Sequence, residues 1–146
     1  MTIKIFKILI TGLSCLAFAA SACSLGGLQH TVKFSPNSAE LGAKEARELV
    51  EWFIDRRNRL GISYTYAYTN SLKDNQKTRN LSDARLKNIL FLLEPLRNGT
   101  IEIKYGDAPL ENSAKEAQSY FLNVVNVGIQ PKCAETDSCC GGGDRM

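Results

Sequence analysis

The chain has 146 residues, of which 44% are hydrophobic and 23% are charged, and these values are typical of one globular domain. The formal net charge at pH 7 is only +3, so charge gives no reason to expect a nucleic-acid partner. His30 is the one histidine, and no Ser/His/Asp set, Cys/His pair or metal-ligand cluster accompanies it. We therefore expect a protein that is not an enzyme and that carries no metal and no cofactor.

The first 22 residues have the layout of a secretory signal peptide. Lys4 and Lys7 precede an almost wholly apolar run, Ile8–Ala19, and the small residues Ala20-Ser21-Ala22 follow it. The apolar run is shorter than the roughly 18–20 residues that a membrane-spanning helix needs. The sequence therefore predicts export, with residues 1–22 removed from the mature protein.

Cys23 follows the predicted cleavage site directly, so that "AASAC" resembles a lipobox, in which the cysteine becomes the acylated N-terminus of a lipoprotein. The stretch departs from that pattern at Ala20, where lipoboxes usually have Leu. The same residues also suit an ordinary signal peptidase, which would leave a free cysteine on a soluble periplasmic protein. We expect the lipidated form, with palmitate-type acyl chains. Ser24, rather than Asp, follows the cysteine, and this implies an outer-membrane lipoprotein that faces the periplasm.

The first part of the mature chain predicts a tether, one strand and one helix. Residues 23–30 contain the Gly-rich tether, and 31–34 is a brief strand. Gly42 suits a helix N-cap, and Gly61 suits the residue after a helix C-terminus. Between them, apolar residues recur at helical spacing: Ala46, Leu49, Val50, Phe53, Ile54 and Leu60.

The middle of the chain predicts a strand followed by a second helix. Over 62–69, small residues alternate with bulky ones, which predicts a strand with one bulky face: Tyr64, Tyr66 and Tyr68. We expect these rings to pack in the core or on the sheet rather than to form a carbohydrate platform. The polar stretch 69–85 then leads into a helix with an apolar stripe between Leu86 and Leu93, ending near Pro95.

The remaining elements complete one mixed pattern. Residues 100–105 alternate as a third strand, 106–113 suit a loop, 114–121 suit a helical turn or more, and 122–129 suit a last strand. Strands that alternate with helices imply helices packed on a sheet. The sequence therefore predicts a single domain over 31–130 of the α/β class, an α+β sandwich with helices packed on one mixed sheet.

Residues 131–146 form a Cys- and Gly-rich tail without apolar periodicity, which we expect to be flexible. Cys15 leaves with the signal peptide, and if Cys23 is acylated, three cysteines remain: Cys133, Cys139 and Cys140. We then expect one disulfide, Cys133–Cys139 or Cys133–Cys140, and one spare thiol in the oxidising periplasm. If Cys23 is free, four cysteines could form two bridges. The absence of a nearby histidine and of a C-x-x-C spacing disfavours a metal site in the tail.

Four stretches resemble the motifs of the OmpA-like peptidoglycan-binding domain, as found in peptidoglycan-associated lipoproteins. They are "VKFSPNSAEL" (32–41), "YAYTN" (66–70), "NLSDARLKNILFLL" (80–93) and "IEIKYGDAPLEN" (101–112). The resemblance covers about residues 31–129. It implies a non-catalytic protein that binds the peptidoglycan stem peptide and tethers the outer membrane, or a complex of other envelope proteins, to the cell wall. The alternative is an OmpA-like scaffold that has lost this ligand and serves protein contacts in a secretion or pilus assembly.

The resemblance also implies a ligand site. In that family, an Asp after the second strand and an Arg early in the next helix hold the zwitterionic end of meso-diaminopimelate. The matching residues are Asn70 and Arg85, fifteen residues apart. A guanidinium suits a carboxylate because it can donate two parallel hydrogen bonds, and an anion suits an ammonium. Asn70 is neutral, and a neutral hydrogen bond contributes about 0.5–1.5 kcal/mol against about 1.5–3 kcal/mol for one to a charged group.

Two further residues complete the expected ligand site. Asp74 is the candidate for the missing negative charge, and Asn37 keeps a polar group where the family's site has one. The sequence departs from the family at Ser35, which replaces an Asp, and in "AYTN", which lacks the usual Gly. The plain alternative is that Asn70 only ends a strand and that Arg85 is only a helix residue.

Overall fold

The computed structural model describes residues 27–111, 115–136 and 138–140, without the side chains of 115–118 and 140. The predicted signal peptide and lipobox, including Cys15 and Cys23, lie outside these residues, as does the end of the tail. Within the described part of the chain, no helix has both the length and the hydropathy that crossing a membrane requires.

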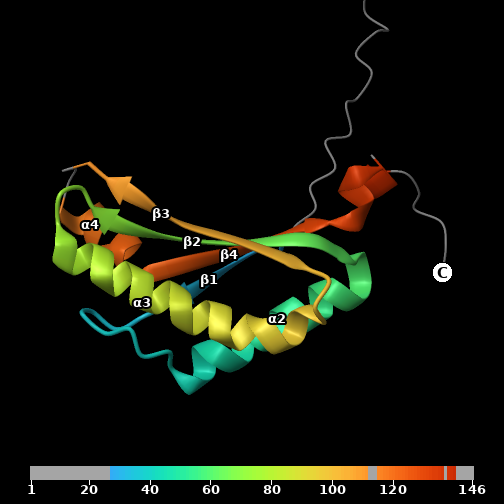
Figure 1. Ribbon diagram of the computed structural model, residues 1–146, viewed down its shortest axis with the longest axis horizontal. Coiled ribbons are helices and arrows are strands. Elements are labelled where there is room, and N and C mark those ends of the chain that lie inside the picture. Colours follow the sequence, from blue (N-terminus) through green and yellow to red (C-terminus); the bar gives the residue numbers. More distant parts are fainter. Residues whose placement is uncertain (1–26, 112–114, 137, 141–146) are drawn as a thin grey trace, which may run out of the picture.

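One mixed sheet of four strands forms the centre of the domain, which confirms the predicted fold class (Figure 1). The strands are β1 (Gln29–Lys33), β2 (Ile62–Leu72), β3 (Glu102–Leu110) and β4 (Val124–Pro131). Their order across the sheet is β1-β4-β2-β3, with β2 and β3 parallel and the other neighbours antiparallel. A parallel pair needs a crossover connection, and helix α3 (Gln76–Leu93) supplies it.

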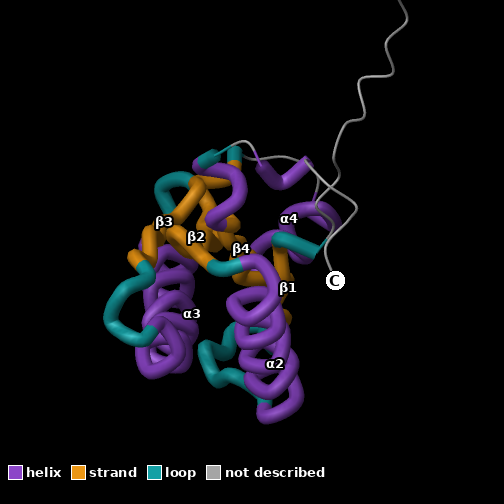
Figure 2. Tube along the Cα trace, turned by 90° about the vertical axis from the view of Figure 1, so that its right-hand side faces the viewer, coloured by secondary structure: helices purple, strands orange, loops and turns teal. Residues whose placement is uncertain are grey.

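Two long helices, α2 and α3, lie side by side on one face of the sheet (Figure 1 and Figure 2). Helix α2 spans Ala43–Leu60, the range that the sequence predicts. Gly61 follows it with a φ of 64°, a left-handed value that glycine adopts without steric cost, and its N–H donates to Arg57 O at 3.1 Å. Helix α4 (Lys115–Leu122) lies at the end of the sheet toward which β2 and β3 run (Figure 1).

The hydrophobic core lies between the sheet and these two long helices. It includes Val32, Phe34, Leu49, Phe53, Ile62, Ala67, Leu86, Ile89, Leu93, Ile101, Val125, Val127 and Ile129. From β2, the small residues Thr65, Ala67 and Thr69 face this core, and each is at most 1% exposed. The bulky face of β2 is therefore not its core face.

The tyrosines of β2 pack on the open face of the sheet, which is one of the two placements expected from the sequence. Tyr66 stacks with Tyr68 at 6.2 Å between ring centroids, and its hydroxyl accepts a hydrogen bond from Gln29 Nε2 at 2.9 Å. The Tyr66 ring lies over Gly128 of β4, where a Cβ atom would come within 2.0 Å of Tyr66 Cζ. A glycine at that position is therefore what lets the ring lie flat on the neighbouring strand.

The polar stretch 69–85 belongs mostly to regular structure rather than to a connection. Strand β2 continues to Leu72 and α3 begins at Gln76, so only Lys73–Asn75 joins them. Asn75 is the N-cap of α3, because its side chain accepts from Thr78 N at 3.1 Å. The apolar stripe that starts at Leu86 marks only the second half of the helix, which is why the sequence placed the start of the helix too late.

Strands β3 and β1 also differ from their predicted bounds. The loop expected after residue 105 is wrong, because β3 continues to Leu110, which pairs with Leu72 of β2. Pro109 is tolerated there because β3 is an edge strand, and an edge position needs no donor on its outer side. Strand β1 starts at Gln29, so His30 lies in the sheet rather than in the tether, with its ring centroid 5.4 Å from that of Trp52.

In the described part of the tail, a disulfide joins Cys133 to Cys139, with the two Cα atoms 4.8 Å apart. This confirms one of the two predicted pairings. Two short 3₁₀ turns, Lys132–Glu135 and Ser138–Cys140, carry the bonded cysteines. A further 3₁₀ turn, Glu94–Arg97, follows α3 and contains Pro95, near which the sequence predicted the helix to end.

Candidate binding site

A hollow of about 290 Å³ opens at the end of the sheet where β2 meets the start of α3. Four parts of the chain meet there: the loop before α2, strand β2, the first turns of α3, and the segment from α4 into β4. The lining residues are Pro36, Asn37, Asn70, Thr78, Leu81, Ser119, Leu122 and Asn123. None of these side chains is charged. This hollow, called the Asn70 pocket below, therefore offers a ligand amide, hydroxyl and apolar surface.

Asn70 lies in β2, is 8% exposed and is followed by two more strand residues, so it does not end the strand. Its Nδ2 donates a long hydrogen bond, 3.4 Å, to Phe121 O. Because a carbonyl oxygen can only accept, the amide nitrogen must face Phe121. No group among the described residues donates to Asn70 Oδ1, so this acceptor stays available to an N–H of a ligand.

Arg85 is only 1% exposed and lies inside the fold, on α3. Its guanidinium lies over the Phe34 ring at 5.1 Å from the centroid. It donates four hydrogen bonds to protein oxygens: Ser38 O at 2.8 Å, Ser35 O at 2.9 Å, Asn123 Oδ1 at 3.2 Å, and Leu122 O. Arg85 therefore ties α3 to the loop before α2 and to the segment that enters β4.

Arg85 does not line the Asn70 pocket but lies behind two of its lining residues, Leu122 and Asn123. Asn70 and Arg85 were expected to hold the same ligand, but only Asn70 lines the pocket. Among the described residues, the ion pairs do not include Arg85. Burial lowers the pKa of Arg85 from its ordinary value, but an arginine keeps its charge at physiological pH. A positive charge thus stands behind a neutral pocket wall.

The two auxiliary residues of the expected site lie in different places. Asn37 lines the pocket, with a φ of 57° that asparagine tolerates better than most residues. Asp74 is exposed on the turn after β2 and does not line the pocket. Six lining residues were not predicted from the sequence: Pro36, Thr78, Leu81, Ser119, Leu122 and Asn123. Of these, only Thr78 and Leu81 could have been placed together from the local sequence. They lie three residues apart, and so on one face of the helix that Asn75 caps.

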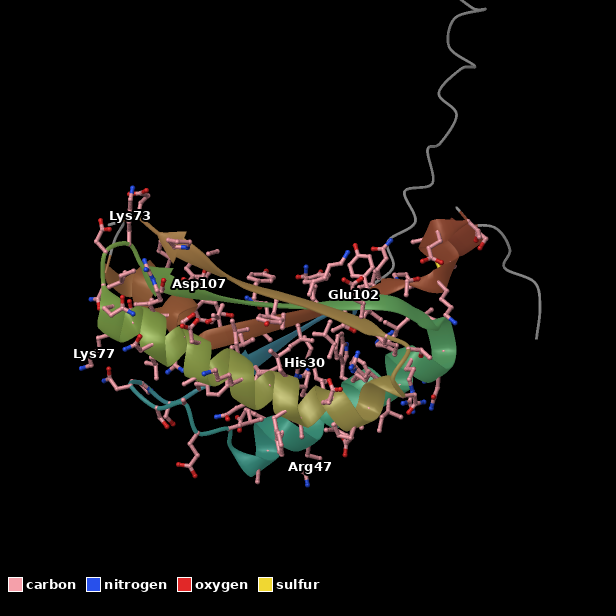
Figure 3. The ribbon with its side chains drawn as sticks, in the orientation of Figure 1. His30, Arg47, Lys73, Lys77, Glu102 and Asp107 are labelled. Carbon is pink, nitrogen blue, oxygen red and sulfur yellow. A yellow bond between two sulfur atoms is a disulfide. The ribbon has the colours of Figure 1, made fainter. Side chains whose placement is uncertain are left out.

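A second hollow, of about 520 Å³, adjoins the Asn70 pocket and shares Asn37, Thr78 and Leu81 with it. Lys77 lines this second hollow and points outward at this end of the molecule (Figure 3). Asp107 lines neither hollow; its carboxylate accepts hydrogen bonds from Ser71 Oγ and, at 2.9 Å, from Ser82 Oγ. Among the described residues that line the two hollows, Lys77 is the one with a charged side chain.

Comparison of the sequence with protein-family models and with curated proteins finds no match. Among solved structures, the chain is similar to the OmpA-like domain of FopA1 from Francisella tularensis subsp. tularensis SCHU S4, with 16% sequence identity and a TM-score of 0.50 over 74% of this chain and 78% of that chain. It is also similar to the cell wall anchor of the T6SS from Pseudomonas aeruginosa, with 14% identity and a TM-score of 0.51 over 71% of this chain and 81% of that one. The protein thus has the fold of an OmpA-like domain, carried by a divergent sequence.

Proposed function

We propose that this protein is a non-catalytic envelope protein that binds the peptidoglycan stem peptide in the Asn70 pocket. The observation that carries the proposal is that Asn70 and Asn37, which match the ligand site of OmpA-like domains, line one pocket in an OmpA-like fold. The similar structure from Pseudomonas aeruginosa is described as a cell wall anchor, which supports the same class of partner.

Each site residue has a distinct role in this proposal. Asn70 Oδ1 accepts a hydrogen bond from a nitrogen of the ligand, and Asn37 adds a polar contact. Arg85 acts on the ligand carboxylate through its charge from behind the wall, where low solvent access strengthens Coulomb attraction. Asp74 meets the ligand only outside the pocket. This division describes binding without chemistry, because the described residues of the pocket lining include no nucleophile paired with a base.

We further propose that acylation of Cys23 holds the protein in the outer membrane. The domain would then connect that membrane, directly or as part of an envelope complex, to the cell wall. Residues 24–28 separate the predicted lipid from β1 and give the domain its reach.

A sedimentation assay with purified peptidoglycan sacculi tests the proposal. The full-length protein, extracted from membranes in detergent, should sediment with sacculi. Asn70→Leu keeps most of the side-chain volume but removes the amide, so we expect it to lose most of this binding. Asn58→Leu, an exposed position on α2 outside the pocket, is the matched control and should bind as the natural protein does. A natural protein that stays in the supernatant would show that the proposal is wrong.

The second candidate is an OmpA-like scaffold that binds no peptidoglycan and serves protein contacts in a secretion or pilus assembly. Two observations favour it: the side chain of Asn70 is neutral, and the guanidinium of Arg85 donates its hydrogen bonds to protein oxygens. The same sedimentation assay separates the candidates. A scaffold should not sediment with sacculi, and Asn70→Asp alone should not make it do so.

A further inference from the structure

We infer that the Asn70 pocket selects a stem peptide whose side-chain amino group is acylated, as in a peptide cross-link, over one whose amino group is a free ammonium. The inference rests on the proposed function and names the chemical form of its ligand. A diamino acid in a stem peptide keeps its carboxylate in both forms. The two forms differ in the nitrogen, which is a cation when free and a neutral amide N–H when acylated.

The acceptor in the pocket suits the neutral form. Asn70 is 8% exposed, and its amide nitrogen is turned to Phe121 O, which leaves Oδ1 as the group that a ligand meets. The amide oxygen of Asn70 can accept a hydrogen bond from an amide N–H of the ligand, just as a backbone carbonyl accepts one from a backbone N–H. A buried ammonium needs an anionic partner to offset its loss of hydration, and an amide N–H needs only an acceptor.

The charges around the pocket disfavour an ammonium. Among the residues whose side chains the structure describes, no acid lines the pocket, and Arg85 lies directly behind Asn123, to which it donates at 3.2 Å. Lys77 adds a second positive charge in the adjoining hollow. Asp107 lies outside the pocket and accepts hydrogen bonds from two serine hydroxyls, and Asp74 is exposed on the turn after β2. The positive charges of Arg85 and Lys77 disfavour a cation in the pocket and favour the carboxylate that both ligand forms carry.

The shape of the site also leaves room for an acyl group. Leu81, Leu122 and Pro36 give the pocket apolar surface that suits acyl carbon atoms. The adjoining hollow of about 520 Å³ shares Asn37, Thr78 and Leu81 with the pocket, so a chain that continues beyond the amide has a path along the start of α3. An unmodified ammonium would leave this apolar surface unused.

Chemical acetylation of sacculi provides the test. One portion of sacculi is treated with acetic anhydride, which converts the free amino groups to neutral amides, and the other portion is left untreated. We expect the full-length natural protein to bind the acetylated sacculi several-fold more strongly. Asn70→Asp, which places an anion at the acceptor, should reverse the preference and bind untreated sacculi several-fold more strongly. Competition between free diaminopimelate and its mono-N-acetyl derivative gives a second, soluble measurement of the same preference.

The outcomes separate the two proposals. If the natural protein binds untreated sacculi but loses binding on acetylation, or binds both portions equally, the selection inferred here is wrong while the proposed function stands. If it binds neither portion, the proposed function fails. If the preference for acetylated sacculi is the same in Asn70→Asp, then Asn70 is not the group that distinguishes the amide from the ammonium, and the inference is overturned.

Discussion

Arg85, which the sequence predicted as a ligand residue, makes its described contacts with the rest of the fold. Its position in the sequence matches a ligand residue of OmpA-like domains, yet its guanidinium donates hydrogen bonds to oxygens of the protein itself. Those oxygens belong to the loop before α2 and to the segment entering β4, which are two walls of the Asn70 pocket. Loss of peptidoglycan binding in an Arg85 variant would therefore not identify Arg85 as a ligand contact unless the fold were shown to be intact.

We expect Arg85→Ala to lower the free energy of unfolding by on the order of 3 kcal/mol or more. The substitution removes the donor for Ser35 O, Ser38 O and Leu122 O and leaves a cavity beside Phe34. Urea unfolding, followed by circular dichroism, measures the change. Arg85→Lys keeps the charge but cannot donate in the same planar geometry, so it should recover only part of the stability. A loss below about 1 kcal/mol for Arg85→Ala would contradict this structural role.

His30 makes stability depend on pH. Its ring lies near Trp52, and burial lowers its pKa below 6.5, an effect that Glu48 partly opposes. Because the unfolded chain has the higher pKa, it binds more protons than the folded chain as the pH falls through 6.5. The contribution of neutral His30 to stability is therefore present above that pH and is lost as the pH falls through the folded-state value.

Comparison of the natural protein with His30→Phe tests this expectation. The urea midpoint of the natural protein should fall between about pH 7.5 and about pH 5, and His30→Phe, which keeps a ring against Trp52, should show a smaller fall. Carboxylates that titrate over the same range contribute equally to both proteins, so the difference between the two falls isolates His30. Equal falls in the two proteins would rule out a contribution from His30.

At the scale of single elements, the sequence correctly predicted the features that depend on neighbouring residues in the chain. Helix α2 has the predicted bounds because Gly42 and Gly61 flank an unbroken apolar stripe. For β2, alternation predicted a strand but not which face would be buried. That choice follows from the helices: the small face of Thr65, Ala67 and Thr69 lies against them, and the tyrosines extend over β4 where Gly128 leaves space.

Elements that depend on distant partners could not be delimited from the sequence. The last residues of β3 are regular only because Leu72 and its neighbours in β2 pair with them. In the sequence, nothing distinguishes Ser71 and Ser82 from other polar residues. In the structure, both donate hydrogen bonds to Asp107 and so join β2 and α3 to β3. The expected loop after residue 105 was wrong because tertiary pairing overrides local composition.

The N-cap of α3 gives a prediction at the scale of this element. Asn75→Ala should lower the free energy of unfolding by about 1 kcal/mol, because Thr78 N loses its acceptor at the start of the helix. Asn75→Ser keeps a side-chain acceptor and should lose much less. Asn80→Ala, an exposed position on the same helix, controls for the loss of an asparagine as such. Urea unfolding of the three variants measures the difference, and equal losses for Asn75→Ala and Asn75→Ser would mean that the cap does not stabilise α3.

At the scale of the whole molecule, the pocket exists only because segments far apart in the sequence meet at one end of the sheet. Asn37, Asn70 and Asn123 come from three different segments and share one hollow. The sequence motifs identified Asn37 and Asn70, but Ser119 and Asn123 have no motif, and their place follows from α4 packing beside the end of β2. The absence of charge in the lining likewise became visible only when Arg85 was found behind the wall rather than in it.

The attachment of the whole molecule to a membrane depends, in our proposal, on Cys23. Cys23→Ser should move the protein from the membrane fraction to the soluble periplasmic fraction, because serine cannot form the thioether that anchors acyl chains, while the export signal in residues 1–22 is unchanged. Fractionation of cells grown with radiolabelled palmitate measures both location and acylation. Cys15→Ser, in the predicted signal peptide, is the matched control and should keep both the label and the membrane location. A natural protein that is soluble and unlabelled would show that the lipobox interpretation is wrong, and the domain would then reach the cell wall from the periplasm without an anchor at this cysteine.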